Sequence, residues 1–164
     1  MFQPAQKQQW DPVEGFRPSL GTPEAQRELR GWALLALGAL AIAGVYALLL
    51  AISRIPGADN LFPWPVAFYE KSLIIHVVFS FVIWFLAAAL IFMQIATYRT
   101  SEGAPHHASL GRTAFAALIV AFLCLAIPAL MDRGIPSINN YVPAIIDPVY
   151  YIGLLLAGFA GILM

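Results

Sequence analysis

Four long apolar stretches, separated by polar and charged segments, constrain this chain more than any other feature of its sequence. A helix needs about 20 consecutive apolar residues to cross the roughly 30 Å hydrocarbon core of a bilayer. Backbone polar groups in lipid must be satisfied within the segment, so stretches of this kind form helices. They are residues 31–53, 72–98, 110–131 and 148–164. We therefore predict an all-α integral membrane bundle with four transmembrane helices.

The composition excludes three other classes of protein. Sixty per cent of the residues are hydrophobic and 11% are charged, and nine Lys and Arg residues balance nine Asp and Glu residues. A disordered chain needs low hydrophobicity and high net charge, a soluble enzyme domain carries about 25% charged residues, and a nucleic-acid binder needs a basic excess. The single cysteine, Cys124, cannot form an internal disulfide, and its apolar surroundings favour a buried small side chain.

The distribution of basic residues predicts the orientation in the membrane. The first thirty residues are polar, and we assign residues 1–30 to a cytoplasmic tail and residues 31–164 to the transmembrane domain. Within this tail, Thr22 followed by Pro23 is typical of a helix start. The tail and the loop between the second and third spans carry six basic residues, against three on the other side. Positive residues concentrate on the cytoplasmic side, so the N-terminus is predicted to be cytoplasmic. The six are Lys7, Arg17, Arg27, Arg30, Arg99 and Arg112, and the three are Arg54, Lys71 and Arg133.

His76 is the one histidine within a predicted span. It is the fifth residue of the stretch 72–98, which corresponds to roughly 6–8 Å below the outer end. Ionisable groups at membrane depth are costly and often functional. A neutral imidazole could bond a neighbouring helix or Ser72, or it could ligate a haem iron. Ser80 and Trp84 are predicted to share its face, which suits either a macrocycle or ordinary helix packing.

The remaining polar residues carry weaker signals. His106 and His107 lie in a polar loop with no nearby Cys, Asp or third His, which favours solvated side chains over a metal site. Asp132 and Arg133 are predicted to form a local ion pair at the membrane interface. Arg133 could also reach a haem propionate, because a guanidinium suits a carboxylate. Pro128 is predicted to kink the outer end of the third span.

The order of these features resembles a known family. The second span reads His76-Val77-Val78-Phe79-Ser80-Phe81-Val82-Ile83-Trp84-Phe85-Leu86-Ala87, and the run Asn139-Asn140-Tyr141-Val142-Pro143 precedes Asp147-Pro148 at the fourth. Over roughly residues 25–164 the chain resembles the N-terminal part of subunit I of the haem–copper oxidases. It is most similar to the divergent alphaproteobacterial type of cytochrome c oxidase subunit I.

The resemblance implies a role in respiration. It makes His76 an axial ligand of a low-spin haem, with Ser80, Trp84 and Arg133 near it, and it places the chain in a bacterial inner (plasma) membrane. Electrons from cytochrome c would pass through this haem toward an oxygen-reducing centre outside this segment. The high-spin haem and copper require the remainder of the subunit. The implied partners are that remainder or a second half-subunit, other oxidase subunits, cytochrome c and the lipid bilayer, with no nucleic acid.

The chain departs from the family pattern in two ways, which leave an alternative function open. The other metal ligands of the family come from later helices, and residues 149–164 provide roughly 24 Å of helix. We therefore expect a partial chain or one half of a split subunit, which is not an active cytochrome c oxidase by itself. The alternative is a haem-free accessory or structural subunit of a larger respiratory or photosynthetic complex. A small transporter is disfavoured, because the spans contain no carboxylate and no broken inverted repeat.

Overall fold

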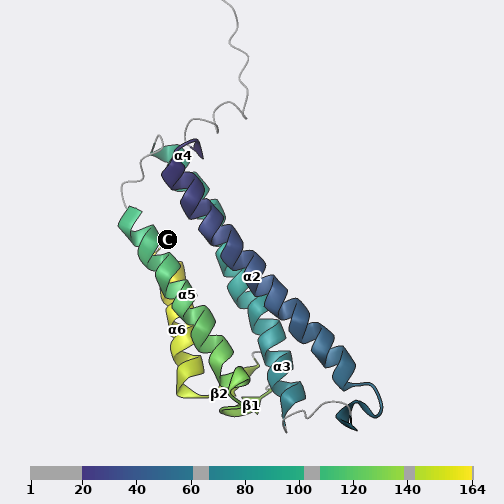
Figure 1. Ribbon diagram of the computed structural model, residues 1–164. Helices are drawn as coiled ribbons and strands as arrows, with labels where there is room; N and C mark the ends of the chain where they lie inside the picture. Colours follow the sequence, from purple (N-terminus) through teal and green to yellow (C-terminus); the bar gives the residue numbers. More distant parts are fainter. Residues whose placement is uncertain (1–19, 61–66, 102–107, 139–142, 164) are drawn as a thin grey trace, which may run out of the picture.

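The computed structural model describes residues 20–60, 67–101, 108–138 and 143–163. Within these ranges the chain forms four helices, of which the second consists of three consecutive segments (Figure 1). The elements are α2 (Pro23–Ser53), η1 (Ala58–Asn60), α3 (Phe68–Val77), η2 (Val78–Ile83), α4 (Trp84–Thr100), α5 (Ala108–Leu130), β1 (Ile135–Ser137), β2 (Ala144–Ile146) and α6 (Pro148–Ile162). The prediction of an all-α architecture with four helices is confirmed.

Three of the four helices are long and apolar enough to cross a membrane, as a multi-pass membrane protein requires. They cover Pro23–Ser53, Phe68–Thr100 and Ser109–Leu130. The fourth, α6, has 15 residues. At 1.5 Å per residue it is roughly 22 Å long, which is shorter than the bilayer core of about 30 Å. Of the four predicted spans, three therefore correspond to helices that could cross a membrane, and α6 is shorter than a full span.

Side-chain caps set the starts of α2 and α6. The Thr22 hydroxyl accepts a hydrogen bond from the Ala25 amide at 3.3 Å, and Pro23 occupies the first turn. This confirms the predicted helix start and places it inside the segment that we assigned to the tail. Asp147 caps α6 in the same way, with its carboxylate 2.8 Å from the Val149 amide. Both caps satisfy amides that have no partner within the helix.

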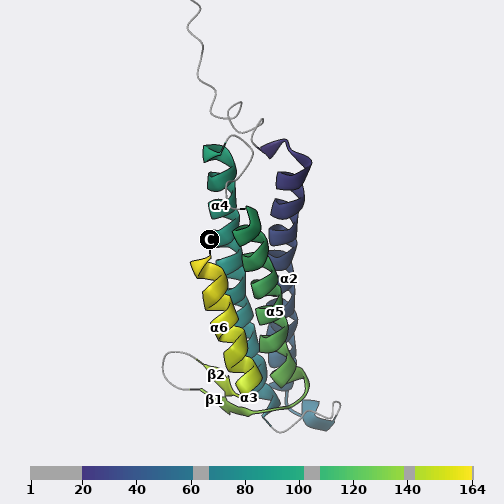
Figure 2. The ribbon, with the colours of Figure 1, turned by 90° about the vertical axis from the view of Figure 1, so that its left-hand side faces the viewer.

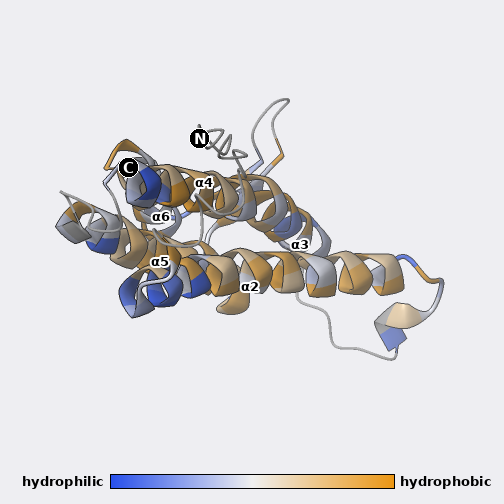
Figure 3. Ribbon diagram, turned by 90° about the horizontal axis from the view of Figure 1, so that it is seen from above, coloured by the Kyte–Doolittle hydropathy of each residue, from blue (hydrophilic) through white to orange (hydrophobic). Residues whose placement is uncertain are grey.

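The helices pack as two layers. Figures 1 and 2 show α2 beside the continuous helix α3–η2–α4, with α5 and α6 paired next to them. We call the end where α2 begins and α4 ends the N-terminal end, and the opposite end the hairpin end. Figure 3 shows apolar residues along the helix bodies and polar residues gathered toward their ends. Buried alanines on α2 allow close helix approach, and they are Ala36, Ala39 and Ala43.

A short β-hairpin closes the bundle at the hairpin end. Strands β1 and β2 pair antiparallel, with Ile135 opposite Ile146 and Ser137 opposite Ala144. Gly134 precedes the hairpin at φ +72, and a Cβ there would lie 2.7 Å from Ile145 Cγ2, so only glycine fits. The sequence gives these strands only three residues each, which is too short for a readable alternation. We therefore did not predict them.

Two ion pairs lie beside this hairpin, and they correct a prediction. Asp132 does not pair with its neighbour Arg133. Its carboxylate lies 2.6 Å from Lys71 Nζ, and Arg133 lies 3.4 Å from the Asp147 carboxylate. Asp132 adopts a positive φ of 51 at the end of α5, and each of the two neighbouring side chains has a partner elsewhere in the bundle. The Lys71 side chain is only 7% exposed, and a buried ammonium needs a counter-ion.

Candidate functional site

His76 lies in α3 at its interface with α2. Its Nδ1 is 2.8 Å from the backbone carbonyl oxygen of Ala43. A carbonyl oxygen can only accept a hydrogen bond, so Nδ1 carries the proton when the ring is neutral. Nε2 then keeps its lone pair, and no described residue donates a hydrogen bond to it. The ring is thus held in the tautomer that a metal-ligating histidine uses, with Nε2 as the free ligand atom.

The sequence of α2 makes this contact possible. Ala39 and Ala43 are almost fully buried, and methyl side chains at this spacing let the α3 backbone approach α2 closely. The first span therefore supplies the carbonyl that orients His76. Because α3 begins at Phe68 and not at residue 72, His76 lies about two turns from the start of its helix.

A pocket of about 300 Å³ lies beside His76, between α2 and α3. Aliphatic side chains form one part of its lining, and a guanidinium, a phenol and an imidazole form the other. They are Ala47, Leu50, Ala51, Arg54, Tyr69, Leu73 and His76. This volume is at the lower end of the range for small-molecule sites. A planar apolar ligand with a negatively charged edge would suit both parts of the lining.

Arg54 lines this pocket, although the sequence did not single it out as a candidate. Its guanidinium donates a hydrogen bond to the Tyr69 hydroxyl and lies 4.8 Å from the centroid of the Tyr69 ring. We used Arg54 only to count charges. Its position in the sequence could have indicated that it lies near the second predicted span, because the end of the first span and the start of the second lie at the same membrane face. Tyr69, which Arg54 contacts, lies about two turns from His76 along α3, so the guanidinium lies at the opposite end of the same pocket from the imidazole.

Ser80 and Trp84 do not line this pocket. The Ser80 hydroxyl donates to the carbonyl oxygen of His76 at 2.6 Å, and Trp84 is half-buried against the helix core. The cause is their position along the helix: the pocket extends from His76 toward Leu73 and Tyr69, whereas Ser80 and Trp84 lie one and two turns from His76 in the other direction. The proposed contacts of Ser80 and Trp84 with haem remain predictions.

The aromatic side chains near His76 divide between two environments. Phe79 is buried and packs edge-to-face against Phe122 of α5, with 4.8 Å between ring centroids. Phe81 and Phe85 are 72% and 65% exposed, respectively, and face away from the bundle core. These exposed rings would contact lipid or another subunit.

The other predicted site residues lie elsewhere. Arg133 pairs with Asp147 at the hairpin end and does not line the pocket, so its role toward a propionate also remains a prediction. His106, His107 and the run Asn139–Val142 lie outside the described residues. In the described part of the chain, no group of three His, Cys, Asp or Glu side chains could hold a metal ion.

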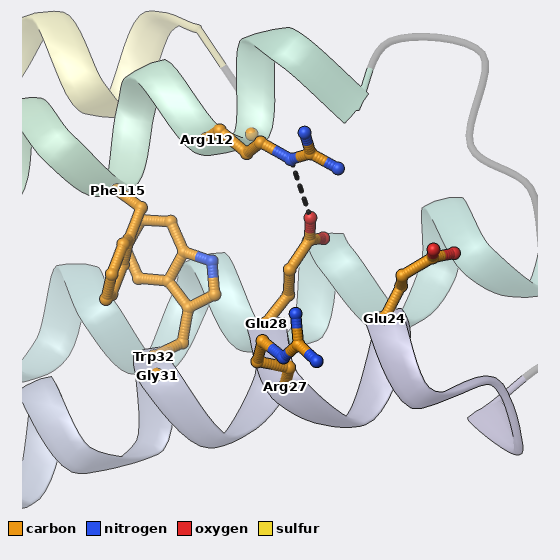
Figure 4. A pocket seen from close by; sticks show the side chains of 8 residues that line it. Glu24, Arg27, Glu28, Gly31, Trp32, Arg112 and Phe115 are labelled. Carbon is orange, nitrogen blue, oxygen red and sulfur yellow. Dashed lines mark hydrogen bonds and ion pairs between the residues drawn. The ribbon is translucent and has the colours of Figure 1, made fainter.

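A second polar site lies at the N-terminal end, and the sequence did not reveal it. The Glu28 carboxylate accepts hydrogen bonds from Gln94 Nε2 at 2.6 Å and from the Tyr98 hydroxyl at 2.7 Å. Arg112 of α5 donates to the same carboxylate at 3.3 Å. These partners are at least 66 residues from Glu28 along the chain, so only the packed bundle brings them together. A pocket of about 390 Å³ adjoins this cluster (Figure 4).

Comparisons with known proteins identify one relative and no family. No family model matches the chain, and no solved structure matches it. An "Uncharacterized protein" of Aquifex aeolicus (strain VF5) is 38% identical over 125 residues. The match covers 76% of this chain and 30% of the relative, so the chain spans less than a third of that protein's length.

Proposed function

We propose that this chain is the N-terminal part of the catalytic subunit of a membrane respiratory haem–copper oxidase, with His76 as an axial ligand of the low-spin haem. One observation carries the proposal. The Ala43 carbonyl accepts a hydrogen bond from Nδ1 at 2.8 Å, which leaves Nε2 of a pocket-lining ring as a lone-pair donor. Histidines that ligate metals usually donate their second nitrogen to a carbonyl or carboxylate, which fixes the ring and raises its basicity.

The lining of the pocket fits a haem. Alanine and leucine side chains suit the apolar macrocycle, and Arg54 beside Tyr69 suits a propionate carboxylate. The π-helical segment that follows His76 adds support, because such segments often occur at functional sites. A bound haem would supply one-electron transfer, and this chain would fix its orientation and tune its potential. The pocket is small, so the remainder of the subunit would cover the other side of the haem.

The resemblance described above supplies the rest of the proposal. Cytochrome c would donate electrons to the haem, and the oxygen-reducing haem–copper centre would lie outside this segment. The partners are the remainder of subunit I or a second half-subunit, together with other oxidase subunits, in a bacterial inner membrane with the N-terminus cytoplasmic. The single histidine that lies within the spans gives this chain one ligand position and no oxygen-reducing centre of its own.

One observation favours a second candidate, a haem-free accessory or structural subunit. The bond from His76 to the Ala43 carbonyl also satisfies a neutral imidazole between two helices. In that case His76 joins α2 to α3 and binds no iron. Haem analysis of the intact complex separates the two candidates.

The test is a reduced-minus-oxidised spectrum of the intact complex carrying His76→Ala. We expect loss of the low-spin haem band, and we expect His76→Met to retain a low-spin band at a shifted potential, because methionine also ligates haem iron. His107→Ala, the same chemical change in the predicted loop, is the matched control. Immunoblotting verifies that each variant reaches the membrane. A low-spin band that His76→Ala leaves unchanged would exclude the proposed ligand.

A further inference from the structure

The pocket at the N-terminal end has a lining unlike that beside His76. It encloses about 390 Å³ between α2 and α5 and holds two arginines, two glutamates and two aromatic rings (Figure 4). The lining residues are Glu24, Arg27, Glu28, Gly31, Trp32, Gly111, Arg112 and Phe115. Formal charges of +2 and −2 cancel, so the lining favours a ligand that carries both signs.

The indole N–H of Trp32 has no hydrogen-bond acceptor among the described residues around this pocket. The side chain is 2% exposed, and its ring packs edge-to-face on Phe115 with 4.9 Å between centroids. No described residue accepts a hydrogen bond from its indole N–H, and Figure 4 shows the nitrogen on the side of the ring that faces Glu28 and Arg112. Buried indole N–H groups usually find a partner. The pocket therefore presents a donor for a ligand oxygen.

The charged side chains supply further donors and acceptors. Arg112 makes one bond to Glu28 and its side chain is 69% exposed, so it keeps further N–H groups for an anionic oxygen. Arg27 lines the pocket on the α2 side. Glu24 and Glu28 are one turn apart on α2 and present carboxylate oxygens to the same space. An anion and a hydrogen-bonding cation can thus both be satisfied.

The location of the pocket favours a lipid. It lies at the start of two helices that are long enough to cross a membrane, where headgroups meet the hydrocarbon core. Leu34 lies one turn deeper than Gly31, and Ile119 lies one turn deeper than Phe115. These two apolar side chains are 59% and 38% exposed, respectively. They would offer apolar surface to acyl chains directly below a bound headgroup.

We propose that this pocket binds the headgroup of a phosphatidylethanolamine-type phospholipid. The phosphate accepts from Trp32 Nε1 and from Arg27 and Arg112, and the primary ammonium donates to Glu24 and Glu28. A choline headgroup has no N–H to donate to the carboxylates. A glycerol headgroup has no cation and adds negative charge beside two glutamates. The inference stands apart from the proposed haem site, which lies at the other end of α2.

The experiment measures which lipid the purified full-length protein retains. The protein in detergent is incubated with vesicles of equimolar phosphatidylethanolamine, phosphatidylcholine and phosphatidylglycerol, and bound lipid is counted by native mass spectrometry. We expect one phosphatidylethanolamine per chain. Trp32→Phe and Arg27→Gln should each reduce its retention about tenfold, which corresponds to losing one charge-assisted hydrogen bond. Glu24→Gln should abolish the preference over phosphatidylcholine.

The controls separate this site from non-specific binding. Arg30→Gln changes a basic residue of α2 that does not line the pocket, so retention should stay at the wild-type level. Millimolar phosphoethanolamine without acyl chains should not displace the lipid. Equal retention of the three lipids, preference for phosphatidylglycerol or displacement by the soluble headgroup would overturn the proposal. Should Trp32→Phe fold poorly, the exposed Glu24 and Arg27 variants still decide the question.

Discussion

A histidine between two helices has two ring nitrogens that can form hydrogen bonds. The Ala43 carbonyl of α2 accepts a hydrogen bond from only one of them, Nδ1 of His76. The other is available for chemistry if a ligand reaches it. Arg54 can then test whether a ligand occupies this pocket, because it brings a positive charge to the pocket that His76 lines. A nearby cation disfavours the oxidised, more positive state of a haem iron and raises its reduction potential.

Arg54→Gln tests this charge. If the proposed low-spin haem is bound, its midpoint potential should fall by tens of millivolts, because removing a repulsive cation stabilises the oxidised iron. Arg54→Lys keeps the charge and should retain most of the wild-type potential. Redox titration of the complex measures the shift, with Arg30→Gln at the opposite end of α2 as the control. A potential that Arg54→Gln does not change would place the haem away from this pocket.

Lys71 and Asp132 allow a second residue-scale prediction, because the two partners differ in burial. The Lys71 side chain is 7% exposed and that of Asp132 is 54% exposed. Asp132→Asn leaves a buried ammonium without its counter-ion and should lower the free energy of unfolding by about 2–3 kcal/mol. Lys71→Met leaves a carboxylate that water can reach, so it should lower the free energy of unfolding by less than Asp132→Asn does.

Asparagine also tolerates the positive φ at position 132, so the substitution changes charge without straining the backbone. Thermal unfolding in detergent ranks the variants. The double variant Lys71→Met with Asp132→Asn should be more stable than Asp132→Asn alone. The reverse order of the two single variants would show that Lys71 is solvated.

The contact between α5 and α6 depends on one glycine. A Cβ at Gly153 would lie 2.8 Å from Leu125 Cγ and 3.1 Å from Cys124 Cβ, so a larger residue must push the helices apart. Gly158, five residues further along α6, has no neighbour within 4 Å of such a Cβ. The two glycines therefore differ in packing within one helix.

Gly153→Ala should destabilise the protein by about 1–3 kcal/mol, since overpacking forces backbone shifts. Gly158→Ala should be neutral or slightly stabilising, because alanine is the better helix former. Thermal unfolding of both variants in the same detergent gives the comparison. Equal midpoints would mean that α5 and α6 do not pack as closely as described.

At the level of elements, the lengths of the apolar stretches predicted the helices, but they did not predict the π-helical segment between α3 and α4. The runs 31–53 and 110–131 match α2 and α5 in their main part because a long apolar stretch has few other structures available. The π-helical segment Val78–Ile83 leaves no mark in composition. The sequence also could not show that the pocket extends from His76 toward Tyr69 and away from Ser80 and Trp84. Pairings such as Glu28 with Gln94 depend on tertiary packing, which a single sequence does not encode locally.

At the scale of the whole molecule, the described bundle leaves much apolar surface uncovered. On α6, Leu155 and Ile162 are 74% and 84% exposed, and Phe92 of α4 is 72% exposed. In water such surfaces would aggregate, whereas lipid or further helices would cover them in a membrane. The exposed side chains lie on the outer sides of both layers, so the bundle can bind neighbours on more than one side.

The orientation of this bundle links the two proposed sites and can be tested directly. Replacing Cys124 by Ala gives a background without cysteine, because the chain has only one. Asn60→Cys then marks the hairpin end and Ser101→Cys marks the N-terminal end. The basic residues favour a cytoplasmic N-terminal end. A membrane-impermeant maleimide should therefore label position 60 in intact cells and position 101 only after permeabilisation. The opposite pattern would place the His76 end in the cytoplasm, where the proposed haem would be out of reach of a cytochrome c outside the membrane.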